Sequence, residues 1–209
     1  MSKRKAMTFT RALFTATLLL GSAAAAAEGE PLGVTFGPYY RISVPLAGEE
    51  ANPSWAGGAF RLRYEWTDEL AISGAFTYDR YEFDEKIMPA VVGVSDLLER
   101  QIFALRGGVI YNLPLEWTYP YAGGGLALAR EKAVYRRYAD PLVRWHPALY
   151  GEAGTYIPLV GPLVIDVGAD FTVLLGKRAG DYDRDAGGYQ DTGGAALYLG
   201  LQAGVGLFL

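Results

Sequence analysis

The C-terminal stretch from Thr192 to Leu209 constrains the fold more than any other part of the chain. Every second residue, counted back from Leu209 to Ala195, is apolar, and the residues between them are mostly small, with one amide and one phenol. Because successive side chains of a strand point to opposite faces, this period of two predicts a β-strand. A soluble sheet would bury the apolar face in a core. A membrane barrel would turn that face to lipid and the small face into its lumen.

The N-terminus has the features of a secretory signal peptide. A positive region (Lys3, Arg4, Lys5 and Arg11) precedes a short apolar stretch, and small residues follow up to Ala27. We therefore expect residues 1–27 to be a cleaved signal peptide and residues 28–209 to form one barrel domain. An uncleaved anchor is the alternative, but its apolar core is shorter than the roughly 20 residues that a spanning helix needs.

Composition narrows the class of protein further. Four of the 19 basic residues belong to the signal peptide, so 15 remain against 23 acidic residues and the net charge becomes −8. This acidity argues against nucleic acid as a partner. The chain has no cysteine, so it offers no disulfide framework. Its 27 glycines and 15 tyrosines suit bent strands and a lipid–water interface.

Eight segments of the mature chain alternate between apolar side chains and small or polar ones. We predict strands at Gly33–Val44, Trp55–Trp66, Leu70–Tyr81, Gln101–Asn112, Tyr119–Tyr135, Ala148–Ile157, Leu163–Gly176 and Thr192–Leu209. An even number of strands allows an up-and-down barrel to close. The predicted fold is therefore all-β, an eight-stranded antiparallel up-and-down transmembrane β-barrel.

The connections between these strands alternate strictly in length. Short links fall at 67–69, 113–118 and 158–162, and long charged ones at 45–54, 83–100, 136–147 and 177–191. Short periplasmic turns and longer outer loops are typical of bacterial outer-membrane barrels. Aromatic residues gather at both ends, as the two membrane interfaces favour: Tyr64, Trp66, Tyr111, Trp117 and Tyr119 at the short-turn end, and Trp55, Tyr78, Tyr135 and Trp145 at the other.

Charged residues near the strand centres all fall on the small or polar face, whereas a soluble barrel would invert the two faces. The interior of an eight-stranded barrel is just wide enough for its own side chains, and buried charges must be paired. We therefore predict a structural charge network in the lumen, formed by Arg41, Arg61, Arg63, Glu65, Asp79, Arg106, Glu152, Asp166 and Asp170. A gated ion or proton path through the same residues is the alternative.

These patterns resemble the small eight-stranded outer-membrane barrels of the outer-membrane protein A, X and W types. The resemblance is carried by the signal peptide, by the strand start Tyr119–Gly125 and by the alternating C-terminal strand. It implies localisation in the cell outer membrane, contact with outer-membrane lipid and lipopolysaccharide, and insertion by the barrel assembly machinery. The chain departs from the family at its last residue, because Leu209 holds the outward position that usually belongs to Phe, and Phe208 points the other way.

The predicted third outer loop carries three arginines among aromatic residues. Guanidinium groups pair well with phosphates, so Arg136, Arg137 and Arg144 are candidates for contact with lipopolysaccharide. A solvated loop without such a ligand explains the same residues equally well.

Catalytic, cofactor and metal sites are not expected. His146, the single histidine, is predicted at the outer start of the sixth strand as an interfacial residue, and Ser54 lies on a strand that is not its neighbour. The spacing of Asp181, Asp183 and Asp185 resembles a calcium loop, but Ala186 replaces the turn glycine and Arg184 opposes a cation.

The function expected from the sequence is a non-enzymatic structural or surface-interaction role. A narrow channel for small or hydrophobic solutes, as the W-type resemblance implies, is the first alternative, and a lipid A-modifying enzyme is the second. The sequence leaves the oligomeric state open.

Overall fold

The computed structural model describes residues 33–47, 51–83, 97–113, 115, 118–135, 140–183, 188–192 and 194–209, with the backbone path alone for residues 180–183 and 188–192. The unit that contains them extends from Gly33 to Leu209. The predicted signal peptide, residues 1–27, lies outside the described residues. None of the described residues lies in a helix long and apolar enough to cross a membrane.

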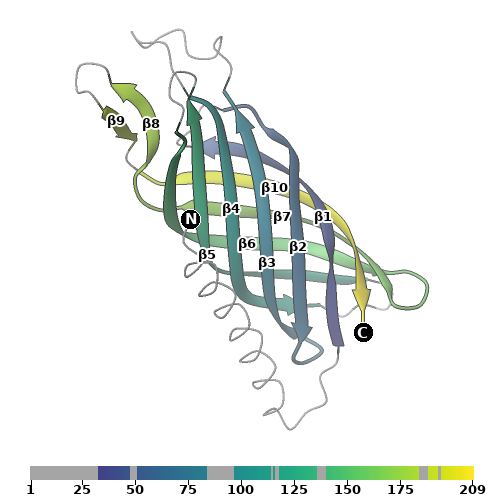
Figure 1. Cartoon of the computed structure of the whole chain (residues 1–209). Helices are drawn as coiled ribbons and strands as arrows, with labels where there is room; N and C mark the ends of the chain where they lie inside the picture. The colour runs from purple at the N-terminus through teal and green to yellow at the C-terminus, as the bar shows by residue number, and fades with distance from the viewer. Residues whose placement is uncertain are drawn as a thin grey trace, which may run out of the picture. The chain divides into compact units, whose positions relative to one another are not determined.

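Eight of the ten described strands close into a barrel (Figure 1). These eight are β1 (Gly33–Ala47), β2 (Ser54–Glu65), β3 (Leu70–Glu82), β4 (Leu97–Asn112), β5 (Tyr119–Tyr135), β6 (Leu142–Pro158), β7 (Leu163–Leu174) and β10 (Ala196–Phe208). All neighbours are antiparallel, and the order around the ring is β1-β10-β7-β6-β5-β4-β3-β2. The structure thus confirms the predicted all-β, eight-stranded antiparallel barrel.

The ring closes between its first and last strands. Ile42 of β1 lies opposite Leu201 of β10, and the register continues down to the C-terminus. There the backbones of Val34 and Leu209 exchange two hydrogen bonds of 2.9 Å. The closing strand therefore pairs along its length with the strand that begins the ring.

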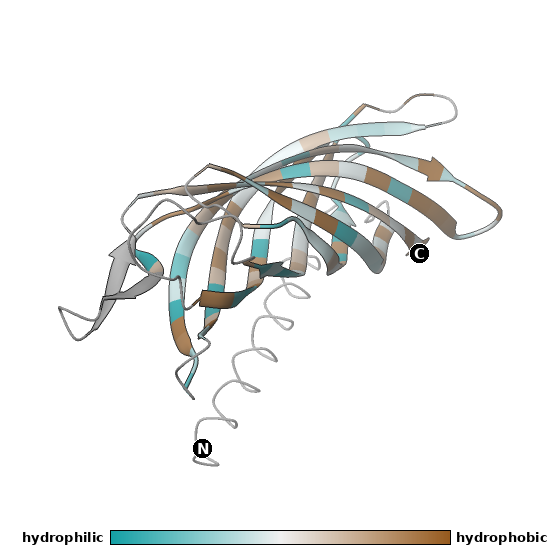
Figure 2. Ribbon diagram, turned by 90° about the horizontal axis from the view of Figure 1, so that it is seen from above, coloured by the Kyte–Doolittle hydropathy of each residue, from teal (hydrophilic) through white to brown (hydrophobic). Residues whose placement is uncertain are grey.

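The two faces of the wall differ as the alternation predicts. Large apolar side chains such as Leu62, Leu105, Leu126 and Phe171 are exposed on the outward face. Between them along the same strands lie buried lumen residues, so apolar and polar bands alternate along the ribbons in Figure 2. A wall that is apolar outside and polar inside suits lipid around it and a filled lumen within.

One end of the barrel, the turn end, has tight connections at 66–69 and 159–162, and we call the opposite end the outer end. At the outer end two strands are much longer than predicted, because β4 starts at Leu97 and β6 at Leu142. Two others are shorter, since β7 ends at Leu174 and β10 starts at Ala196. The period of two continues through the charged parts of β4 and β6 that the sequence predicts as loops. The fourth outer connection contains a hairpin, β8 (Arg178–Asp183) with β9 (Gly188–Thr192), at the end of the barrel away from the C-terminus (Figure 1).

The aromatic residues agree with two interfacial belts, with one correction. Trp66, Tyr111 and Tyr119 are exposed at the turn end, and Trp55 and Trp145 at the outer end. Tyr135 is buried instead, because it shares the inward face of β5 and packs with Leu97, Ala133 and Ala179. Trp117 lies outside the described residues.

Candidate functional site

Arg41 is the centre of the ionic contacts in the middle of the lumen. Its Nε lies 3.0 Å from Oδ1 of Asp79, and its Nη2 donates to Oδ1 of Asp170 at 3.0 Å. Arg106 reaches the same Asp170 oxygen at 3.0 Å and donates to the Thr172 hydroxyl at 2.8 Å. These contacts join β1, β3, β4 and β7, so they bridge strands that are distant in the ring.

A second group surrounds Arg61 nearer the turn end. Its guanidinium pairs with Glu152 and lies 3.0 Å from Oδ2 of Asp166. The hydroxyl groups of Tyr39 and Tyr121 each donate to Asp166 at 2.8 Å. Both oxygens of the Asp166 carboxylate thus accept hydrogen bonds from other strands. These bonds offset the cost of burying the charge.

The third group lies at the turn end of the lumen. Nε of Arg63 is 2.7 Å from Oε1 of Glu65, and the Asn112 amide donates to the other Glu65 oxygen at 2.8 Å. The Arg63 guanidinium also lies 4.2 Å from the centre of the Tyr156 ring. We call the three groups together the inner network; it contains all nine predicted lumen charges, each in an ion pair: Arg41, Arg61, Arg63, Glu65, Asp79, Arg106, Glu152, Asp166 and Asp170.

Small residues of the closing strand make room for the inner network. A Cβ atom on Gly200 would lie 2.3 Å from Nη1 of Arg41, so only glycine leaves the guanidinium in place. This contact explains the glycine at position 200 on the small face of the stretch Thr192–Leu209.

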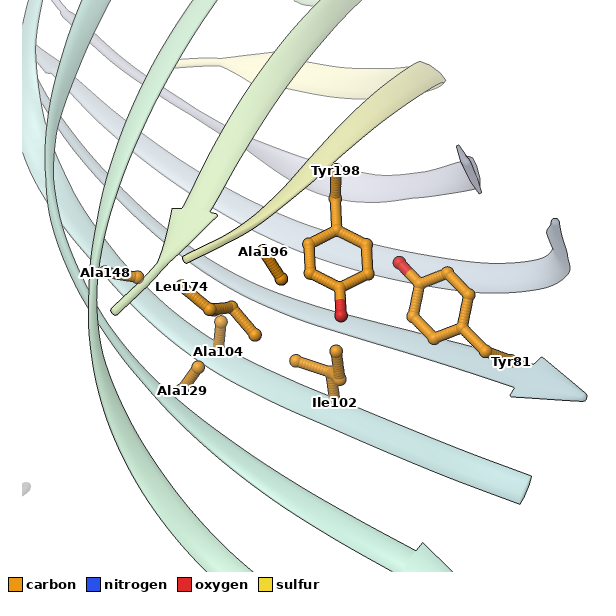
Figure 3. Close-up of a cluster of buried hydrophobic side chains, with 8 residues drawn as sticks. All are labelled: Tyr81, Ile102, Ala104, Ala129, Ala148, Leu174, Ala196 and Tyr198. Atoms are coloured by element: carbon orange, nitrogen blue, oxygen red, sulfur yellow. The ribbon is translucent and has the colours of Figure 1, made fainter. Parts of the chain in front are cut away.

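An apolar layer covers the inner network toward the outer end. Figure 3 shows its side chains converging inside the barrel: Tyr81, Ile102, Ala104, Ala129, Ala148, Leu174, Ala196 and Tyr198. The rings of Tyr81 and Tyr198 are 5.2 Å apart, and the Tyr81 hydroxyl lies 2.6 Å from that of Ser43. A cavity between this layer and Arg41 has a volume of about 10 Å³. Such a cavity holds about one water molecule.

A separate charged group, the outer cluster, lies beyond the apolar layer and consists of Arg100, Glu131 and His146. Glu131 is fully buried, with one oxygen 2.6 Å from Nε of Arg100 and the other 2.7 Å from Nε2 of His146. Arg100 also donates to the carbonyl oxygen of Ala179 in β8 at 2.7 Å. The cluster therefore ties the base of the hairpin to the barrel.

Sequence reasoning missed the outer cluster, although a signal for it exists. The sequence predicts a loop at 83–100, which contains Arg100, and the run Gly123–Gly125 obscures the two faces of the fifth strand. Arg106 points into the lumen, and every second residue from it along β4 does so too, which includes Arg100. Glu131 lies on the inward face of β5 in the same way.

The position of His146 corrects the expectation of an interfacial residue. Its ring is buried inside the lumen, because β6 extends beyond the predicted start and keeps His146 on the inward face. Ser54 is buried as well, and its hydroxyl accepts a hydrogen bond of 2.9 Å from the Arg80 backbone. β2 and β6 are not neighbours in the ring, as predicted.

The remaining candidate residues lie at the outer end. Arg144 belongs to β6 rather than to a loop, and its Nη1 donates to the carbonyl oxygens of Lys177 and Arg178 at 3.2 Å. Arg136 and Arg137 lie outside the described residues. The same is true of Asp185 and of the side chains of Asp181 and Asp183. Among the side chains that the structure does describe, no group of three or more acidic, histidine or cysteine residues could hold a metal ion.

Known structures with the same fold include two bacterial proteins. Neisserial surface protein A has a TM-score of 0.55 and 13% identity, over 84% of this chain and 95% of that chain. Ail, the attachment invasion locus protein of Yersinia pestis, was solved in complex with the heparin analogue sucrose octasulfate. It has a TM-score of 0.50 and 15% identity, over 85% of this chain and 97% of that chain. No family model and no curated protein matches the sequence. The chain therefore has the fold of the small eight-stranded outer-membrane β-barrels, as the resemblance in its sequence implied.

Proposed function

We propose that this protein is a non-enzymatic outer-membrane barrel whose lumen is closed and whose outer end carries its structural or surface-interaction role. The observation that carries this proposal is the filling of the lumen at three successive levels. The inner network, the apolar layer and the outer cluster follow one another from the turn end to the outer end. An ion crossing the barrel would have to displace buried ion pairs and then pass an apolar constriction, and both steps are costly.

The filled lumen also separates this proposal from its alternatives. A narrow channel needs a polar path, and the layer around Ile102 and Leu174 interrupts one. A lipid A-modifying enzyme needs a base that faces lipid, whereas His146 is buried in the lumen against Glu131. Neither alternative has a supporting contact among the described residues.

Conductance across a planar lipid bilayer tests the closed lumen. We expect the purified protein to show no steady current, and Asp166→Ala to show none either, because the apolar layer above Asp166 stays intact. A double variant of that layer, Tyr81→Ala with Tyr198→Ala, removes one of the three barriers and is expected to raise ion flow above that of the unmodified protein. A steady current through the unmodified protein that Asp166→Ala changes would instead establish the channel.

We further propose that the partners are outer-membrane lipid and lipopolysaccharide, with the barrel assembly machinery acting during insertion. The loop arginines Arg136 and Arg137 remain candidates for lipopolysaccharide phosphates, and Arg144 a weaker one, since its guanidinium holds the hairpin base. We expect Arg136→Glu combined with Arg137→Glu to lower the amount of lipopolysaccharide that co-purifies. Unchanged co-purification would remove these residues from the proposal.

Export by a cleaved signal peptide belongs to the same proposal. Residues 1–27 would direct the chain across the inner membrane, and residues 28–209 would remain. N-terminal sequencing of protein extracted from outer membranes tests this, and a protein that keeps Lys3 to Lys5 would contradict it.

A further inference from the structure

Among the described strands, basic residues on the outward face of the wall occur at one end only. The described barrel strands carry three that point away from the lumen: Arg80, Arg130 and Lys132. Their direction follows from their neighbours. Ala129, Glu131 and Ala133 are all fully buried on the inward face of β5, and Asp79 and Tyr81, on either side of Arg80 in β3, are buried as well. All three stand in the outer half, and the turn end of the described wall has no such residue.

The three cations differ in how they are neutralised. Arg80 lies 2.8 Å from Glu99 and 3.3 Å from Glu82, so its charge is balanced on the wall itself. Within the described ranges, Arg130 and Lys132 form no ion pair and no side-chain hydrogen bond. The nearby carboxylate of Glu99 is already engaged by Arg80 and by the amide of Gln101. Two neighbouring cations are therefore left facing outward, and we call them the wall pair.

The surroundings of the wall pair match the boundary between acyl chains and head groups. Arg130 lies in register between Phe103 of β4 and Trp145 of β6, and Trp145 is 59% exposed. Leu128 precedes it on the same face and is exposed in the apolar belt. An aromatic flank with apolar residues below and cations above is the arrangement that a membrane interface favours.

We propose that Arg130 and Lys132 form a binding site for the phosphate of an outer-leaflet lipid. Residues two apart on one strand face are about 7 Å apart, so the two side chains can approach one phosphate from both sides. Arginine offers a fork of donors that fits phosphate oxygens, and lysine adds a mobile point charge. The acyl chains of that lipid would lie on Leu128, Leu105 and Phe103, which is why the ligand is a lipid rather than a free anion. The inference rests on the membrane orientation proposed above.

Binding of lipid A in phosphate-free maltoside micelles tests the site. Native mass spectrometry counts bound bisphosphorylated lipid A, dephosphorylated lipid A and inorganic phosphate on the folded protein. We expect the bisphosphorylated form to bind far more tightly than the other two. Arg130→Gln with Lys132→Gln should weaken its binding about 10- to 100-fold, as the loss of two charge-assisted hydrogen bonds implies.

Two matched variants separate the site from general charge attraction. The first variant, Arg130→Lys with Lys132→Arg, keeps both charges, and its affinity for lipid A is expected to lie within about threefold of that of the unmodified protein. The second, Arg80→Gln, removes an arginine whose charge is already balanced by Glu99 and Glu82, and we expect it to leave lipid A binding unchanged. Heat-modifiable gel migration shows that each variant is folded, and the single variants Arg130→Gln and Lys132→Gln replace the double variant if it does not fold.

Three results would overturn the proposal. They are equal binding of phosphorylated and dephosphorylated lipid A, full binding by the folded double variant, or competition by inorganic phosphate at the same concentration as lipid A. None of them changes the conductance expected of a closed lumen, so a failure here is distinct from a failure of the proposed function.

Discussion

The inner network and the outer cluster are two buried ionic groups in one lumen, and they connect the barrel differently. In the inner network Arg41 of β1 meets Asp79 of β3 and Asp170 of β7, so one side chain spans distant parts of the ring. In the outer cluster Arg100, Glu131 and His146 come from the consecutive strands β4, β5 and β6. We infer that the first group holds the ring together and the second orders one sector of the rim.

The apolar layer keeps these two groups apart. Along β4 the inward residues run from Arg106 through Ala104 and Ile102 to Arg100, so charge gives way to apolar packing and then returns. Two charged groups separated in this way are expected to respond independently to mutation, since no ion pair or hydrogen bond among the described residues joins them.

The largest effect is expected from Arg41→Leu, which tests the ring-wide role of the inner network. The change leaves Asp79 and Asp170 buried with Arg106 as their remaining neighbour, and we expect the free energy of unfolding to fall by about 3–5 kcal/mol. Urea titration of the protein folded into phospholipid vesicles measures it. Arg80→Leu is the control, an exposed arginine whose loss should cost less than about 1 kcal/mol. Equal losses for the two variants would contradict a special role for Arg41.

A smaller effect on the same network is expected from Gly200→Ala. The new methyl group would lie 2.3 Å from Nη1 of Arg41, so the guanidinium must leave its place between the two aspartates. We expect a loss of about 1–3 kcal/mol in the same titration, as for other overpacked sites. Gly107→Ala is the matched control, because its Cβ would face outward with nothing within 4 Å. A neutral Gly200→Ala would show that Arg41 is free to move.

The smallest effect on the whole barrel is expected from Glu131→Gln in the outer cluster. Arg100 keeps the carbonyl oxygen of Ala179 as an acceptor, and the rim can open locally to hydrate its charge. We expect the free energy of unfolding to fall by only about 1 kcal/mol. Amide hydrogen exchange at Arg178 and Ala179 should become faster while exchange around Arg41 stays unchanged. A loss as large as that of Arg41→Leu would mean that the two groups unfold as one unit.

The difference between the two groups also explains what the sequence could predict. Arg41, Arg61 and Arg63 could be assigned to the lumen because a strict period of two surrounds them and lipid outside the wall disfavours charges on the outward face. Their partners could not be named, since the contact of Arg61 with Glu152 and Asp166 crosses the lumen and leaves no trace in local spacing.

The outer cluster and the wall pair escaped prediction for a different reason. Charged segments at strand ends have the composition of loops, so the sequence predicts Arg100 and Arg144 outside the strands. On β5 the glycines at 123–125 lack the side chains that would distinguish the two faces. The opposite directions of Arg130 and Glu131 therefore follow only from the burial of their neighbours in the closed barrel.

The backbone pairing of Val34 with Leu209 has a consequence for protein engineering. These residues are hydrogen-bonded partners at the turn end, so the two ends of the ring lie side by side. A short linker can join them without crossing the lumen or the membrane, and new termini can then be opened in any connection at the outer end. A circularly permuted barrel made in this way would keep every strand neighbour while presenting both termini at the opposite rim.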